Sequence, residues 1–160
     1  MVIFLDTSAW IKFFLQKAGT EEIKNFLLEQ SQIAENTRAA SAVTLAEMIA
    51  TLKRAVQGHR IKKEEYAPTL SGFKQQWEDM DIPHVDDHHI QQAGHLAETH
   101  TLKGCDAFQL ASAQAIQANV FICSDRELYN AAKTERFIVW NPVNGEYSKS
   151  KEEPPRKPSK

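Results

Sequence analysis

The sequence has few cysteines, no long apolar run and no excess of basic charge. Its two cysteines, Cys105 and Cys123, are too few for a disulfide framework and lack zinc-site spacing, so we expect free thiols in a reducing compartment. No apolar stretch approaches the roughly 20 residues that cross a bilayer, and no basic-then-apolar leader opens the chain. These absences predict a cytoplasmic protein without a membrane segment. The net charge of −2 gives no overall electrostatic footprint for nucleic acid.

The remaining composition is that of an ordinary globular protein. Hydrophobic residues make up 42% of the 160 residues and charged residues 25%, which is close to the average for soluble domains. We expect one domain over residues 1–145, because this length is enough to bury a core. Residues 146–160 are polar, contain three prolines and have no periodicity, so we expect a disordered tail there.

Short apolar runs alternate with longer segments of helical period, which is typical of an α/β fold with a parallel sheet. The runs predict five strands, at residues 2–5, 39–43, 82–85, 120–123 and 137–140. Helices are expected between them, including one over 62–79 that Pro68 and Gly72 should break or kink. The sequence therefore predicts a central, mostly parallel five-stranded sheet flanked by helices.

Four acidic residues stand apart from those that alternate with lysines on helix surfaces. Asp6 follows the run VIFL, Glu47 follows AASAV by four residues, Asp125 follows VFIC by two, and Asp106 opens an alanine-rich segment. Since parallel strands end at a common edge, where ligand sites form, we expect the four carboxylates to gather there.

Helix capping is a competing explanation for each of these acids. Asp6 and Asp106 fit N-cap positions, and the stretches from Thr44 to Glu47 and from Ser124 to Glu127 fit capping boxes. Capping is local, however, and does not require four acids to converge. Spacing alone leaves both explanations open.

The blocks around the acids resemble those of the PIN-domain nucleases, in particular the VapC-type toxins. The resemblance covers most of residues 2–141, in the family's order: FLDTSAWI, SAVTLAEMI, IPHVDDHHIQQAGHLAE, KGCDAFQLASAQA and VFICSDREL. It implies a PIN-like three-layer sandwich. The family's site residues fall at Asp6, Glu47, Asp106, Asp125 and Ser124. Ser8 matches a polar residue that often follows the first acid. Gln109 replaces a frequent histidine, a change that we expect to alter RNA contacts without touching the acids.

The resemblance implies metal-dependent hydrolysis of RNA phosphodiesters. Four carboxylates held together repel one another unless a divalent cation binds them, and an all-oxygen cluster suits Mg²⁺ or Mn²⁺ better than zinc. Asp6, Asp106 and Asp125 are the expected ligands; Glu47 would help to hold the ion or activate water, and Ser124 would orient a ligand. We expect the histidines between 84 and 100 to be exposed.

The family also implies a cognate antitoxin, lying across the acidic groove, and a homodimer. Trp10, Phe13 and Phe14 suit either the core or the dimer surface. Candidate contacts to RNA phosphates are Lys12, Lys53, Arg54, Lys103 and Arg126. The alternatives are a housekeeping RNA-processing nuclease and a PIN-like module that binds RNA or protein without catalysis. An aspartate phosphatase or a receiver domain would need a second acid near Asp6.

Overall fold

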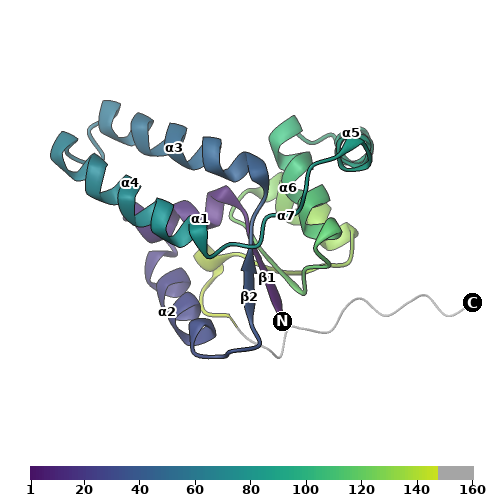
Figure 1. The fold of residues 1–160 in the computed structure, drawn as a ribbon, viewed down its shortest axis with the longest axis horizontal. Helices are drawn as coiled ribbons and strands as arrows, with labels where there is room; N and C mark the ends of the chain where they lie inside the picture. The colour runs from purple at the N-terminus through teal and green to yellow at the C-terminus, as the bar shows by residue number, and fades with distance from the viewer. Residues whose placement is uncertain (148–160) are drawn as a thin grey trace, which may run out of the picture.

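A parallel sheet lies between two layers of helices in the computed structural model, which describes residues 1–147 (Figure 1). The described strands are β1 (Val2–Leu5), β2 (Thr37–Ala39), β3 (Val120–Ile122) and β4 (Ile138–Trp140), in the order β2-β1-β3-β4. Every neighbouring pair is parallel, with Phe4 beside both Ala39 and Phe121. The predicted three-layer α/β sandwich with a parallel sheet is confirmed.

The sheet has four strands among the described residues, rather than the predicted five. The expected strand over 82–85 is absent, and only Asp81 pairs with β2, through an isolated bridge to Ala39. In a parallel ladder the next residue of this segment to bond β2 would be Pro83, which has no N–H to donate. Pairing therefore stops after one residue.

Side chains of the central strands alternate between the two helical layers. Ile3 and Leu5 belong to one core cluster, whereas Phe4 belongs to the other and stacks on Phe121 at 5.3 Å between ring centroids. The first cluster is covered by α1 (Thr7–Phe14), α2 (Thr20–Ser31), α3 (Ala42–Gln57) and α4 (Lys63–Glu78). The second is covered by α5 (Asp87–His100), α6 (Gly104–Ala115) and α7 (Arg126–Thr134), and a short 3-10 turn, η1 (Pro142–Asn144), follows β4.

The bounds of the second strand and the expected break at Pro68 need correction. Residues 42 and 43, assigned to a strand, already belong to α3, so the second strand is shorter and earlier than predicted. Helix α4 also continues through Pro68 without a break. Only one backbone hydrogen bond is lost there, and the Glu65 carboxylate secures the helix start by accepting from the Lys62 N–H at 2.6 Å.

Trp10 is part of the core and not of a dimer surface. It is fully buried, and its ring lies within 5.2 Å of Phe73 and 6.3 Å of Trp77 by centroid distance. Phe13 and Phe14 are partly buried against the same cluster.

Of the predicted tail, residues 148–160 lie outside the described part of the chain. No helix in the described part is long and apolar enough to cross a membrane.

Candidate active site

One pocket of about 390 Å³ contains all five predicted site residues. It lies where β1 and β3 end and where α3 and α6 begin, so the carboxyl edge of the sheet gathers the acids as expected. Its lining comprises Asp6, Thr7, Ser8, Ile11, Lys12, Lys17, Glu47, Thr51, Asp106, Ser124 and Asp125. Lys17 and Thr51 were not predicted because they lie outside the recognised blocks; Thr7 lies within FLDTSAWI, but its place in the site depends on a hydrogen bond to Glu47, 40 residues away.

Asp6 lies at the floor of this pocket and is only 3% exposed. It is the N-cap of α1, and its Oδ2 accepts the Ser8 N–H at 2.9 Å as well as the Ser8 hydroxyl. The capping explanation is therefore correct for Asp6, and it does not exclude a place in the pocket. Its second carboxylate oxygen, Oδ1, accepts no hydrogen bond from residues 1–147.

Ser8 connects the end of β1 to the loop after β3. Its Oγ accepts the backbone N–H groups of Ser124, at 2.8 Å, and Asp125, at 3.1 Å. This bond network fixes Asp125 relative to Asp6 although 119 positions of sequence separate them. The Ser124 hydroxyl itself donates to Asn141 Oδ1 at 3.0 Å, so it borders the pocket while being held by the segment after β4.

Glu47 is held by a buried polar network that links α1, α3 and α6. Its Oε2 accepts from the Thr7 hydroxyl and from the Gln109 amide, both at 2.7 Å. Gln109 is fully buried, and its Nε2 also lies 3.0 Å from the Thr7 hydroxyl and 2.9 Å from the Thr44 hydroxyl, which share its second N–H. The expectation that Gln109 leaves the acids untouched is wrong, because its amide orients one of them.

Of the other three acids, capping does not explain Glu47 and Asp106 but does explain Asp125. Helix α3 begins at Ala42, so Glu47 lies in its second turn, outside the proposed capping box. Helix α6 begins at Gly104, which places Asp106 in the first turn without a capping bond. Asp125, rather than Ser124, is the N-cap of α7 and accepts the Leu128 N–H at 2.9 Å. Capping thus does not explain the positions of Glu47 and Asp106.

Burial and the neighbouring carboxylates raise the pKa values of two acids in the pocket. Burial raises the pKa of Asp6 from 3.8 to about 7; hydrogen bonds from Ser8 oppose this rise, and the charges of Glu47 and Asp106 add to it. Burial also raises the pKa of Asp106, and the charge of Asp125 raises it further. Such a site gains from a cation that stabilises the ionised carboxylates.

The donor set fits a hard divalent cation, although the side chains are not gathered around one point. Within residues 1–147 no three acidic, histidine or cysteine side chains stand close enough to hold an ion as they are oriented. Three carboxylates instead use one oxygen each in hydrogen bonds to Ser8, Gln109 and Leu128. Each keeps a second oxygen, and oxygen ligands are those that Mg²⁺ and Mn²⁺ prefer.

Of the five cations expected to contact RNA, only Lys12 lines the pocket. Lys103 lies next to it, since its charge lowers the pKa of Asp106. Arg54 donates to the lining residue Thr51 at 3.0 Å, whereas Lys53 lies over the Tyr66 ring. Arg126 is exposed.

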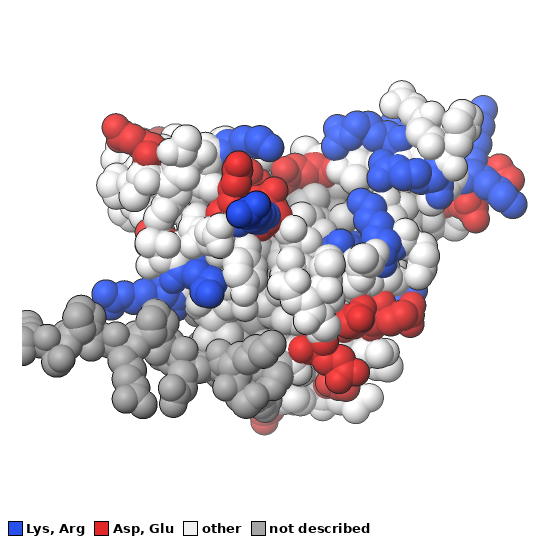
Figure 2. All heavy atoms as spheres, turned by 180° about the vertical axis from the view of Figure 1, so that it is seen from behind, with Lys and Arg blue, Asp and Glu red and all other residues white. Residues whose placement is uncertain are grey.

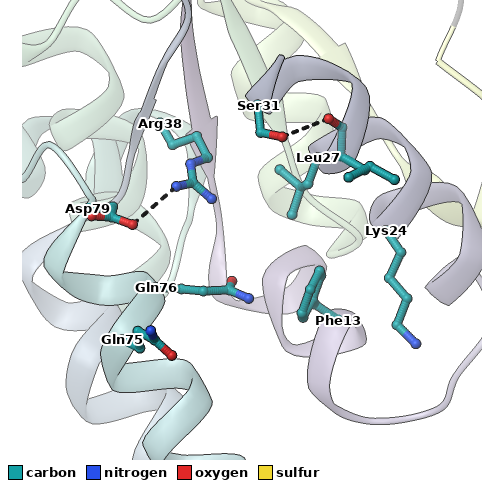
Figure 3. Close-up of a pocket in the computed structure, with 9 residues that line it drawn as sticks. Phe13, Lys24, Leu27, Ser31, Arg38, Gln75, Gln76 and Asp79 are labelled. Atoms are coloured by element: carbon teal, nitrogen blue, oxygen red, sulfur yellow. Dashed lines mark hydrogen bonds and ion pairs between the residues drawn. The ribbon is translucent and has the colours of Figure 1, made fainter. Parts of the chain in front are cut away.

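A second pocket, of about 460 Å³, lies between α2 and α4 (Figure 3). Phe13, Leu27 and Leu28 supply its apolar lining. Its one acidic residue, Asp79, is paired with Arg38 at 3.7 Å. A lone carboxylate already paired with a guanidinium offers no cluster for metal or catalysis, so the acidic pocket is the candidate site.

The histidines and cysteines do not add to the site. His89 is buried, contrary to expectation, and its Nε2 lies 3.1 Å from the Ser112 hydroxyl. Cys123 is buried and Cys105 is exposed. Burial raises the pKa of the Cys123 thiol, which disfavours the thiolate that a nucleophile requires.

Fold and pocket together define an α/β protein with an acid-lined pocket at the carboxyl edge of a parallel sheet. The chain belongs to the PIN domain family, whose pattern it matches over residues 3–134. It is 28% identical over 133 residues to proteins from two strains of Mycobacterium tuberculosis, Ribonuclease VapC45 and Ribonuclease VapC49. Each alignment covers 82% of this chain and 89% of the relative.

Solved structures share the fold at low sequence identity. VapBC2 from Rickettsia felis, bound to a DNA fragment from its promoter, has a chain that matches with a TM-score of 0.63 and 19% identity, covering 88% of this chain and 98% of its own. The Mycobacterium tuberculosis toxin VapC20, described as cleaving the sarcin-ricin loop, matches with a TM-score of 0.61 and 18% identity, covering 81% and 94%. These likenesses support the fold.

Proposed function

We propose that this protein is a Mg²⁺- or Mn²⁺-dependent endoribonuclease and the toxin of a type II toxin–antitoxin pair. The observation that carries the proposal is the convergence of four carboxylates on one pocket; they come from the junction of β1 and α1, from α3, from α6 and from the loop after β3. The relatives named as VapC ribonucleases supply the substrate class. The solved neighbours named as VapBC pairs supply the class of partner.

Asp6, Asp106, Asp125 and Glu47 would hold the ion. A divalent ion in such a site lowers the pKa of a bound water and neutralises charge on the phosphate oxygens. The chain's own residues prepare this site: Ser8 fixes the loop that carries Asp125, and Gln109 with Thr7 orients Glu47. Ser124 would orient a ligand at the rim, and burial of Asp6 keeps bulk water from screening the floor.

The remaining parts of the proposal concern assembly and location. A cognate antitoxin would lie across the acidic pocket, with a basic side chain placed where metal or phosphate otherwise binds. We also propose a homodimer in the cytoplasm. These follow from the family and not from a contact in the structure.

An RNA cleavage assay tests the enzymatic proposal. We expect cleavage with Mg²⁺ or Mn²⁺, none with EDTA, and none from Asp6→Asn or Asp106→Asn. Asp86→Asn is the matched control, because Asp86 also caps a helix, accepting the His89 N–H at 2.8 Å, but lies outside the acidic pocket. Equal cleavage by all variants, or no cleavage of a broad RNA panel by the wild type, would refute the nuclease.

Growth on induction tests the toxin. We expect expression of the wild type to arrest growth and Asp106→Asn to be harmless. An active nuclease whose overexpression leaves growth unchanged would instead support a housekeeping enzyme.

A further inference from the structure

Two lysines lie on the α1 side of the acidic pocket, Lys12 in α1 and Lys17 in the loop that follows. Lys12 is 7% exposed, and its ammonium group makes no hydrogen bond or ion pair with any residue between 1 and 147. Its stem is buried while its Nζ still reaches the open space of the pocket, because His89 Nδ1 is the one buried and unpaired side-chain nitrogen or oxygen among the described residues. An unpaired ammonium group that reaches an open pocket is available to an anionic ligand.

Neither lysine forms an ion pair with a carboxylate among residues 1–147. Burial lowers the pKa of Lys12, and the charge of Lys17 lowers it further, whereas a nearby carboxylate would raise it. The cation that lowers the pKa of Asp106 is Lys103. The acids and the two lysines thus line one pocket of about 390 Å³ without pairing with each other.

The backbone holds both lysines in place. The buried Thr20 hydroxyl donates to the Lys12 carbonyl at 3.0 Å and accepts the Lys17 N–H at 3.0 Å. Gly19 has a φ of +87° and packs so closely on Pro142 that a Cβ would lie 2.9 Å from its carbonyl carbon. The turn between α1 and α2 is thus fixed by packing, which holds the backbone of both lysines beside the pocket that they line.

We propose that Lys12 and Lys17 form a subsite for a backbone phosphate of RNA, next to the phosphate that is cleaved. The inference rests on the proposed function and deepens it. Lysine is a common phosphate-binding residue, and every neighbouring nucleotide supplies one phosphate. Beyond Lys17, the charge of Arg60 is close enough to lower the Lys17 pKa. Figure 2 shows further Lys and Arg side chains gathered where α3 and α4 join. Their positive charge would favour the phosphates of an RNA strand that leaves the pocket in that direction.

RNA binding at several salt concentrations tests the subsite. The full chain carrying Asp106→Asn is titrated with a short single-stranded RNA in Mg²⁺, followed by fluorescence anisotropy. Adding Lys12→Met and Lys17→Gln should reduce the slope of log affinity against log salt by about 0.7, the value of one phosphate contact in a single strand. The matched control is Lys24→Gln with Lys133→Gln, which changes the net charge equally at two helices away from the pocket.

The outcomes separate the two proposals. If the Asp106→Asn protein does not bind RNA in a salt-dependent way and the wild type does not cleave RNA, the proposed function fails and the subsite fails with it. If it binds, but the lysine pair and the control have equal slopes, only the subsite is refuted. In the active protein, Lys17→Gln alone should raise KM with kcat nearly unchanged; a fall in kcat at constant KM would also refute it. Because Lys17 is only half-buried, whereas Lys12 is buried, the Lys17→Gln variant keeps the test valid should Lys12→Met fail to fold.

Discussion

Replacing Asp6 with Asn should stabilise the metal-free protein, and increasingly so as the pH rises. Burial raises the pKa of Asp6 in the folded protein to about 7, against 3.8 for an exposed aspartate. Between these values the folded state binds more protons than the unfolded state, so the free energy of unfolding falls as the pH rises. The loss begins near pH 4 and is complete above pH 7.

The shift sets the magnitude of the effect. About 3 pH units at 1.36 kcal/mol each correspond to roughly 4 kcal/mol. For a domain of this size, that is a difference in Tm on the order of 10 °C. Asn keeps an oxygen that can accept the Ser8 N–H, so the helix cap survives the change.

Thermal unfolding in EDTA at pH 5 and at pH 8 measures the effect. The wild type should lose stability relative to Asp6→Asn between these two pH values, and Mg²⁺ should recover more stability in the wild type than in the variant. Asp86→Asn is the control: the His89 N–H lowers the pKa of Asp86, so this carboxyl is ionised in the folded and the unfolded state at both pH values, and the variant should be less stable than the wild type by the same amount at pH 5 and at pH 8. A Tm difference between wild type and Asp6→Asn that does not change with pH would refute the reasoning.

Two further substitutions test the supports of the site and of the core by chemical denaturation. Ser8→Ala removes the acceptor of two backbone N–H groups, those of Ser124 and Asp125, and should cost about 1–3 kcal/mol; an unchanged midpoint would mean that water replaces the hydroxyl. Phe73→Ala empties a fully buried position against Trp10 and should cost about 3–5 kcal/mol. Gly72→Ala, in the same helix, is the control and should gain up to about 1 kcal/mol, since the added Cβ would meet only a Phe14 ring carbon at 4.0 Å.

The placement of the acids could be predicted because it depends on strand order and chain direction alone. An acid directly after a buried parallel strand must lie at the carboxyl edge, and this located Asp6 and Asp125 from the sequence. The same logic failed for the segment at 82–85, where an apolar pattern suggested a strand but Pro83 cannot extend the ladder.

Tertiary partners could not be predicted in the same way. Thr44 and Glu47 have the spacing of a capping box. A helix capped by Thr44 would begin at residue 45, but α3 begins at Ala42, shortly after the short strand β2. Both side chains instead meet Gln109, 65 and 62 residues away. Lys17 has no sequence signal either, because its position depends on the turn that Thr20 and Gly19 fix.

Gln109 and Gln114 offer a direct comparison between a supporting residue of the site and a structural one. Both lie on α6, and each donates a hydrogen bond to a glutamate of another helix or its end: Gln109 to Glu47 at 2.7 Å, Gln114 to Glu135 at 2.9 Å. Only the first glutamate lines the acidic pocket. Replacing either glutamine with Leu removes a donor to a carboxylate and should lower the free energy of unfolding.

Their effects on RNA cleavage should differ. Without the Gln109 amide, Glu47 keeps only the Thr7 hydroxyl as a donor and is free to turn away from an ion. Loss of such a supporting contact typically costs 10–100-fold in metal affinity or activity, so Gln109→Leu should shift the Mg²⁺ dependence of cleavage upward by about that factor. Gln114→Leu should leave it unchanged. Equal Mg²⁺ curves for the two variants, at equal folded fractions, would show that Glu47 needs no orientation by Gln109 and that the buried network serves the fold alone.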